Sequence, residues 1–362
     1  MKQISTRTGR VLGLATFIAL FLIHGAHAQQ GRSPALDALV KAAQNEKTLN
    51  VVWGPSLGAA AGARALQEGM NKRYGINIAI NYTPGPSFPQ MASRVIQEIQ
   101  AGRPNSTDVS LGAETTMISL MSANALQQIN WREAFPHIRP EMLTKNGESV
   151  QMVTLFTGIY YNTRFIKPDE VPKRMMDVFN PKWKGKIAST PYAGTFDRLA
   201  MQFGPETIRP IVQKTSEWAG GLIRCGEYER LAAGEFIMFF FDCGRGDERL
   251  SVKSGGPMET AILEDAAITT NWFLGIPKNT TKPNLAKLYV GFVASEEGQK
   301  ITQQHGFTST HFVAGTAANA QAKAIEAKGV KLLTHSIDLL MAREPEMERY
   351  RLEYQKMMQT KK

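Results

Sequence analysis

Two kinds of hydrophobic pattern alternate along the first third of the chain. Apolar residues at every second position, such as Ile76, Ile78 and Ile80, are typical of strands. The apolar residues between Phe88 and Ile99 share one face of a helix. The predicted strands are 49–53, 76–81 and 108–111. The predicted helices are 33–45, 59–74 and 88–101, and Gly75 and Gly102 end the second and the third of them. Strands that alternate with helices form a mainly parallel sheet with helices on its faces, so we expect an α/β fold.

The second part of the chain carries longer apolar stretches. Residues 149–162 are largely apolar and β-rich, and residues 236–241 form a strongly apolar predicted strand. Further predicted elements are a strand at 186–189, a helix beginning near Phe196, a helix opened by Pro283, a helix capped by Ser295 and a helical run at 344–356. With 362 residues and 43% hydrophobic content the chain can bury a large core, and we expect two lobes rather than one.

The first 28 residues have the three parts of a cleavable export signal. Lys2, Arg7 and Arg10 form a positive start, residues 11–23 are apolar, and residues 26–28 are an A-x-A cleavage site. The apolar run is shorter than the ~20 residues that a membrane span needs. No cysteine lies at the cleavage point. We therefore expect a mature protein that is free in the periplasm and has no lipid anchor.

The net charge stays positive when that segment is removed. The chain has 42 basic and 32 acidic residues, and losing three basic residues leaves 39 against 32, a net charge of +7. The basic residues are scattered and no nucleic-acid-binding motif is visible, so we expect no nucleic-acid partner. In an exported protein a basic surface favours an anionic small ligand or a partner at a membrane surface.

A basic, aromatic turn followed by a strand lies in the middle of the chain. Residues 171–195 read VPKRMMDVFNPKWKGKIASTPYAGT, and residues 283–299 read PNLAKLYVGFVASEEGQ. Both segments resemble motifs of periplasmic solute-binding proteins of ABC importers, in the branch with ferric-, thiamine- and polyamine-binding members. The resemblance covers most of residues 48–315. It implies that the chain captures a small solute and delivers it to an ABC permease in the inner membrane, with an adaptor for a membrane sensor as the alternative.

The resemblance also implies an architecture. Members have the type II periplasmic-binding-protein fold, in which two lobes, each a mainly parallel sheet flanked by helices, are joined by two crossing strands. Residues 149–162 and 268–278 match the crossings. The implied divisions are a signal peptide at 1–28, lobe one at 29–150 and 272–315, lobe two at 151–271, and C-terminal helices packing on lobe two at 316–362. We expect a monomer.

Loops at the carboxyl ends of the strands are candidates for ligand contact, because ligands of α/β folds lie at this edge of the sheet. Ser56, Ser87 and Thr115 offer hydroxyl groups near helix N-termini, whose N–H groups favour anions. Ordinary helix caps carry the same residues, which is the alternative interpretation. The residues of lobe two that the resemblance places at the ligand are Tyr192, Gly194 and Thr195.

The sign of the ligand's charge is left open by the residues that follow the strand at 236–241. Where ferric-binding members carry adjacent tyrosines, this chain has Gly244 and Arg245, and Glu114 alone approximates their carboxylate. Direct metal coordination is therefore disfavoured. Arg245 is either a clamp for a carboxylate or phosphonate, which favours an anionic solute, or a solvated arginine. The alternatives are an iron complex and a cationic amine in an acidic, aromatic box of Asp242, Trp53, Tyr192 and Trp272.

Cys225 and Cys243 are the only cysteines of the chain. In an oxidising compartment an even pair most often forms a disulfide, worth roughly 3 kcal/mol. Two buried thiols are the alternative. Zinc is disfavoured because neither cysteine has a second ligand at a suitable spacing.

No signature of catalysis accompanies these features. None of His137, His305, His311 and His335 lies at a recognised spacing from a Ser or Cys nucleophile. The sequence has no H-E-x-x-H, P-loop or G-x-G-x-x-G motif. We expect a binding protein, not an enzyme, with no cofactor.

Overall fold

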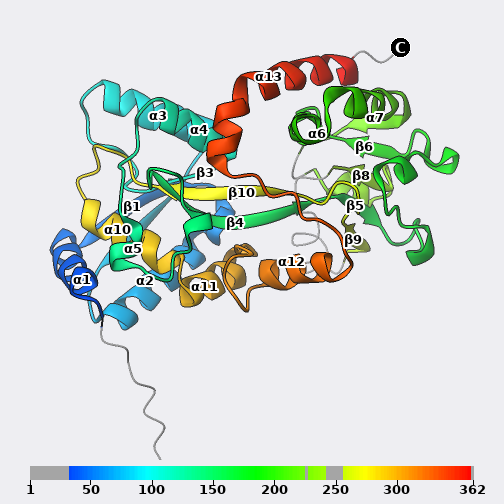
Figure 1. Ribbon diagram of the computed structural model, residues 1–362. Coiled ribbons are helices and arrows are strands. Elements are labelled where there is room, and N and C mark those ends of the chain that lie inside the picture. The colour runs from blue at the N-terminus through cyan, green and yellow to red at the C-terminus, as the bar shows by residue number, and fades with distance from the viewer. Residues whose placement is uncertain (1–31, 225–226, 242–255, 360–362) are drawn as a thin grey trace, which may run out of the picture.

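The computed structural model describes residues 32–224, 227–241 and 256–359 of the chain. These residues form two lobes, each with its own apolar core and its own sheet (Figure 1). The core of lobe one includes Leu49, Trp131 and Tyr289, and the core of lobe two includes Phe196 and Phe240. The division into two lobes that the chain length indicates is therefore present.

The strands of lobe one form a parallel two-stranded sheet and an antiparallel three-stranded sheet, which one parallel bridge joins. Strand β1 (Thr48–Trp53) pairs in parallel with β2 (Ala79–Pro84), and a parallel bridge joins Val51 to Val109, beside β3. Strand β10 (Ile268–Gly275) runs antiparallel between β3 (Ser110–Ala113) and β4 (Ser149–Thr157). The spatial order is therefore β2-β1-β3-β10-β4.

The sheet of lobe two repeats this arrangement. Its order is β7 (Ala219–Leu222), β6 (Ile187–Ser189), β8 (Met238–Phe240), β5 (Ile159–Asn162) and β9 (Met258–Ala261). The first three strands are parallel, and β5 is antiparallel to both of its neighbours. In both lobes the strands that alternate with helices pair in parallel as predicted, and the crossing segments add the antiparallel pairs.

The predicted helices are present together with others that were not predicted, and the run predicted at 344–356 lies within a longer helix that begins at Ile337. Those of the first part are α1 (Pro34–Glu46), α2 (Ala59–Tyr74), α3 (Phe88–Gln100), α4 (Glu114–Ser122) and α5 (Trp131–Ala134). Those that follow are α6 (Phe196–Phe203), α7 (Pro205–Trp218), α8 (Glu229–Ala232), α10 (Pro283–Val293), α11 (Glu296–Gly306), α12 (Ala317–Ala327) and α13 (Ile337–Gln359). Gly75 ends α2 at a φ of 68°, and Ser295 caps α11 through its side chain, both as predicted.

Two strands of lobe one begin later than the sequence pattern predicts. Strand β2 begins at Ala79 rather than at residue 76, and β3 begins at Ser110 rather than at residue 108. Ile76 and Ile78 are nevertheless buried. The alternation of apolar residues thus identified the buried positions correctly. Ile76 and Ile78, however, precede the strand and form no pairs with a neighbouring strand.

The two crossings join the lobes as the resemblance implies. Strand β4 belongs to the sheet of lobe one and β5 to that of lobe two, with only Gly158 between them. Strands β4 and β10 lie side by side and run from one lobe to the other (Figure 1). The exact residue limits of the domains stay predictions.

Gly158 lies where the first crossing passes close to β9. A Cβ atom at this position would lie 2.2 Å from the carbonyl oxygen of Ala261. We expect Gly158→Ala to lower the free energy of unfolding by about 1–3 kcal/mol, because a backbone atom has to move. Gly54→Ala is the matched control, since its added Cβ meets no atom within 4 Å. Equal urea midpoints for the two variants would contradict the expectation.

Helix α13 packs on both lobes. Its first part, with Ile337, Leu340 and Met347, joins an apolar cluster that contains residues of α3 and α4. Its second part, with Tyr350 and Tyr354, joins the core of lobe two. The helix contains Pro345 and is bent, so that it extends from α4 to α6 and α7 (Figure 1).

Among the described residues, no helix is both long enough and apolar enough to cross a membrane.

Candidate functional site

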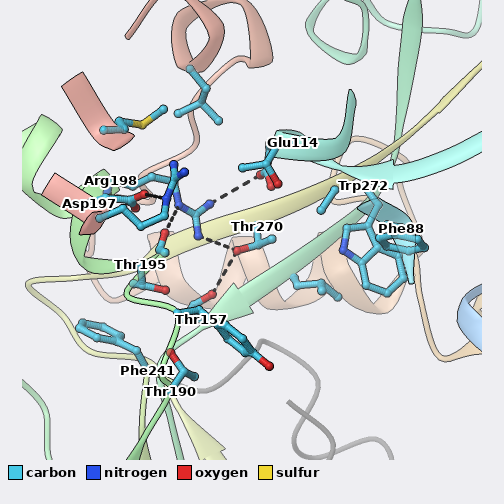
Figure 2. Close-up of a pocket in the computed structure, with 18 of the residues that line it drawn as sticks. Phe88, Glu114, Thr157, Thr190, Thr195, Asp197, Arg198, Phe241, Thr270 and Trp272 are labelled. Carbon is cyan, nitrogen blue, oxygen red and sulfur yellow. Dashed lines mark hydrogen bonds and ion pairs between the residues drawn. The ribbon is translucent and has the colours of Figure 1, made fainter. Parts of the chain in front are cut away.

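A cavity of about 460 Å³ lies between the lobes. Its walls come from lobe one, lobe two, the two crossings and α13 (Figure 2). The lining residues are Ser56, Phe88, Ala113, Glu114, Thr115, Ile118, Leu155, Thr157, Thr190, Tyr192, Gly194, Thr195, Asp197, Arg198, Tyr228, Phe241, Thr270, Trp272, Leu340, Glu344, Met347 and Arg351.

The structure brings seven of the predicted ligand-binding residues to this cavity. They are Ser56, Glu114, Thr115, Tyr192, Gly194, Thr195 and Trp272. They come from the carboxyl ends of strands or the starts of the following helices, except for Trp272, which lies in the second crossing. Their arrangement agrees with the rule that ligands of α/β folds lie at this edge of the sheet. Their role in ligand binding stays a prediction.

Two other predicted ligand contacts are not at the cavity. Trp53 is 2% exposed and packs against Tyr289 in the core of lobe one, with ring centroids 6.3 Å apart. Ser87 is exposed and forms a capping box with Gln90 at the start of α3. Ser87 is thus the ordinary helix cap of the alternative interpretation, and Trp53 is a core aromatic that the sequence analysis did not foresee.

Four predicted residues lie outside the described residues. They are Asp242 and Arg245, proposed for the ligand, and Cys225 and Cys243, proposed for a disulfide.

Arg198 connects lobe two to both the second crossing and lobe one. Its Nε donates to the carbonyl oxygen of Gly194 at 3.0 Å. Its Nη1 and Nη2 donate to Thr269 O at 2.9 Å and to Thr270 Oγ1 at 2.8 Å. An ion pair of 3.6 Å joins Nη1 to Glu114 at the start of α4 (Figure 2). One side chain therefore fixes the loop before α6 relative to β10 and α4.

Glu114 is buried on the lobe-one side of this ion pair. Its Oε1 accepts a hydrogen bond from the backbone N–H of Asn271 in β10. Burial raises the pKa of the Glu114 carboxyl, and the charge of Arg198 and this hydrogen bond act in the opposite direction. The ion pair is thus a buried contact between the lobes. The free-energy cost of removing the Glu114 carboxylate from water is only partly offset by Arg198 and by the hydrogen bond.

A second buried carboxylate joins α6 to α13. Asp197 accepts from Arg351 Nε at 2.7 Å and from the backbone N–H of Arg198 at 2.6 Å. Arg351 also donates to Glu344 at 3.2 Å. Burial raises the pKa of Asp197 to about 6, although both arginines favour its charged form. The charges therefore alternate from Glu114 through Arg198 and Asp197 to Arg351 on α13.

An aromatic wall closes the lobe-one side of the cavity. Phe88 and Trp272 pack edge to face with ring centroids 5.3 Å apart. Figure 2 shows both rings on the side of the cavity away from Thr190 and Thr195. Such a pair offers a rigid apolar surface to a solute.

The residues at the cavity that sequence reasoning missed had weak signals. Arg198 lies in the first turn of α6, where the helix dipole disfavours a cation. A basic residue at such a position was the signal in the sequence that could have indicated a role at the cavity. Thr157 and Thr270 are polar residues within the apolar crossings. Glu344 and Arg351 come from a C-terminal helix whose position no local pattern reveals.

No cluster suited to a metal ion is found within the described ranges of the chain, where no three His, Cys, Asp or Glu side chains converge.

Comparison with known proteins places these features in a family. Residues 112–334, more than half of the chain, match the family model of bacterial extracellular solute-binding proteins. A search of curated proteins finds no match. The fold is similar to that of the substrate binding protein of an ABC transporter from Agrobacterium tumefaciens, with a TM-score of 0.69, 17% identity, and 86% of this chain and 94% of that chain covered.

Two further solved structures are similar at the level of the fold. Iron-bound HitA from Pseudomonas aeruginosa has a TM-score of 0.59 at 18% identity, with 78% of this chain and 98% of that chain covered. The periplasmic binding protein AfuA from Actinobacillus pleuropneumoniae, with exogenous fructose-6-phosphate bound, has a TM-score of 0.63 at 15% identity, with 87% and 100% covered. The predicted two-lobe periplasmic-binding-protein fold is confirmed by these likenesses.

Members of this family are components of transport systems and not enzymes, as the sequence led us to expect. The chain belongs to the bacterial extracellular solute-binding protein family, because the family model matches more than half of its residues.

Proposed function

We propose that this protein is the periplasmic subunit of an ABC importer that captures a small anionic solute between its lobes and delivers it to a membrane permease. Export depends on the signal at residues 1–28, and the mature protein acts as a monomer. The single observation that carries the proposal is the cavity, since both lobes and both crossings contribute to its lining. A solute that contacts both lobes stabilises their closure, and closure presents one surface to the permease.

Hydrogen-bond donors on the lobe-two side support an anionic solute. Arg198, Thr190 and Thr195 line this side of the cavity. Within the described part of the chain, the hydroxyl groups of Thr190 and Thr195 make no hydrogen bond to another residue. A carboxylate or phosphate group accepts hydrogen bonds from such donors.

A cationic amine is the second candidate, because carboxylates also line the cavity. Glu114, Asp197 and Glu344 face two arginines there. Glu114 and Trp272 line the same cavity, and an ammonium group is attracted by a carboxylate and by an aromatic face.

Replacing Glu114 by Gln distinguishes the two candidates. The variant removes the negative charge that competes for Arg198, so we expect the affinity for an anionic solute to rise roughly tenfold. An amine ligand is expected to bind roughly tenfold more weakly to the same variant. The solute is first identified by mass spectrometry of an extract of the purified protein, and its affinity is then measured by calorimetry after unfolding, dialysis and refolding.

Glu296→Gln, an exposed position on α11 that is paired with Lys300, is the control for loss of an acid. An unchanged affinity in Glu114→Gln would show that Glu114 and Arg198 do not lie near the bound solute. A protein that carries no solute and binds none would contradict the proposed function itself.

A further inference from the structure

We infer that the solute is amphipathic, with an apolar ring or chain on the side of lobe one and α13 and a small anionic head on the side of lobe two. This inference rests on the proposed function and adds the chemical class of the solute to it. The observation that carries it is that Phe88 and Trp272 lie across the cavity from Thr190 and Thr195. The exceptions to this division are Ser56, Glu114 and Thr115 on the lobe-one side and Phe241 on the lobe-two side.

The apolar wall has two sources. Lobe one and the second crossing supply Phe88, Ile118 and Trp272, of which Ile118 and Trp272 are at most 7% exposed. Helix α13 adds Leu340 and Met347, each 2% exposed. Contact with an apolar part of a solute removes the remaining apolar surface of these residues from water.

The opposite wall offers hydroxyl groups and a guanidinium. Thr190 and Thr195 come from the loop between β6 and α6, and Arg198 follows in the first turn of the helix. Figure 2 shows these side chains across the cavity from Phe88 and Trp272. The Thr270 hydroxyl accepts from Arg198 at 2.8 Å and lies 3.5 Å from the Thr157 hydroxyl, so its proton is shared between Thr157 and an acceptor in the cavity.

A solute that is polar all round fits these walls poorly. Ile118, Leu340 and Met347 offer no strong hydrogen bond to the hydroxyl groups of a sugar, and an unpaired buried hydroxyl is unfavourable. A bare inorganic anion would leave the apolar wall covered by water. An organic acid with a hydrocarbon body satisfies both walls at once.

The inference is tested by calorimetry on the refolded, solute-free protein with two series of probes. The first series is acetate, hexanoate, phenylacetate and indole-3-acetate, in which the head is constant and the apolar body grows. The second is inorganic phosphate, glucose 6-phosphate, glucose and phenylethylamine. We expect the affinity to rise at least tenfold from acetate to the best acid with a hydrocarbon body, and to exceed every affinity in the second series.

Two pairs of variants assign the binding to the two walls. Phe88→Ala is expected to weaken the best apolar acid about tenfold and acetate much less, and Ser87→Ala, at the neighbouring exposed cap, is the control. Thr195→Val is expected to weaken all acids about fivefold, with Thr207→Val on α7 as the control.

The possible outcomes separate the inference from the proposed function. An affinity that does not rise along the acid series, or tighter binding of a sugar phosphate, phosphate or the amine, would overturn the inference and leave solute capture in place. The same holds if the solute extracted from the purified protein is fully hydrophilic. If no probe binds and no solute is extracted, the proposed function fails together with the inference.

Discussion

Replacing Arg198 by Met is expected to lower the free energy of unfolding by about 3–5 kcal/mol. The guanidinium has four partners in lobe two, β10 and α4, and its side chain is only 11% exposed. Met fills a similar volume but donates no hydrogen bond. Glu114, which is 6% exposed, would then have no cation beside it, and an unpaired buried carboxylate is unfavourable. Urea unfolding at pH 8, where Glu114 cannot easily take up a proton, measures the loss.

A double-mutant cycle isolates the contribution of the ion pair. In Glu114→Gln/Arg198→Met neither charge remains, so we expect part of the stability lost in the single Arg198 variant to return. Lys300→Met is the control for a cation lost from an exposed pair with Glu296, and it should change stability by less than about 1 kcal/mol. Additive effects of the two cavity substitutions would show that the 3.6 Å ion pair has no energetic importance.

Asp197→Asn is expected to become more stable relative to the wild type as the pH rises from 4 to 7. The folded protein raises the pKa of Asp197 from 3.8 to about 6, mainly through burial. The folded state therefore holds this proton more tightly than the unfolded state. The resulting stabilisation is present below pH 4 and is lost as the pH rises through 6, by about 3 kcal/mol in total. Asn mimics the protonated acid and has no such dependence.

Only the difference between the two proteins is diagnostic, because other groups titrate in the same range. Burial lowers the pKa of His311 and of His335 to about 4, so these residues destabilise the folded state as the pH falls from 6.5 to 4. Asp169→Asn, at an exposed position, controls for loss of an acid. A stability difference between wild type and Asp197→Asn that stays constant from pH 4 to 7 would show that Asp197 is ionised throughout this range.

Much of the fold could be predicted because local patterns determine it. Helix α2 lies at the predicted residues, since its ends are fixed by the glycines that precede and follow it. The starts of β2 and β3 were misplaced because apolar alternation reports burial, and ladder pairing depends on the neighbouring strand. Strands β5 and β10 run antiparallel to their neighbours because the chain passes from one lobe to the other at these strands. The hydrophobic periodicity of a segment does not show in which direction its neighbours run.

The candidate site was only partly predictable. Residues of strand-end loops, such as Glu114 and Thr195, line the cavity because every α/β sheet directs such loops to one edge. Trp53 was misplaced because residues at strand ends alternate between core and cavity, and the sequence does not show which face each residue takes. Arg351 reaches the cavity from a distant helix through a contact with Asp197, and long-range contacts of this kind leave no local signal.

The bent helix α13 has a consequence for the order of assembly. All the paired strands of both lobes precede its first residue, Ile337, along the chain. The strands of each lobe can therefore pair before this helix is synthesised, whereas the placement of the lobes relative to each other gains the support of the helix only afterwards. A chain shortened to residue 336 should keep two folded lobes yet lack the side chains of Glu344 and Arg351, leaving the cavity open to solvent along one edge.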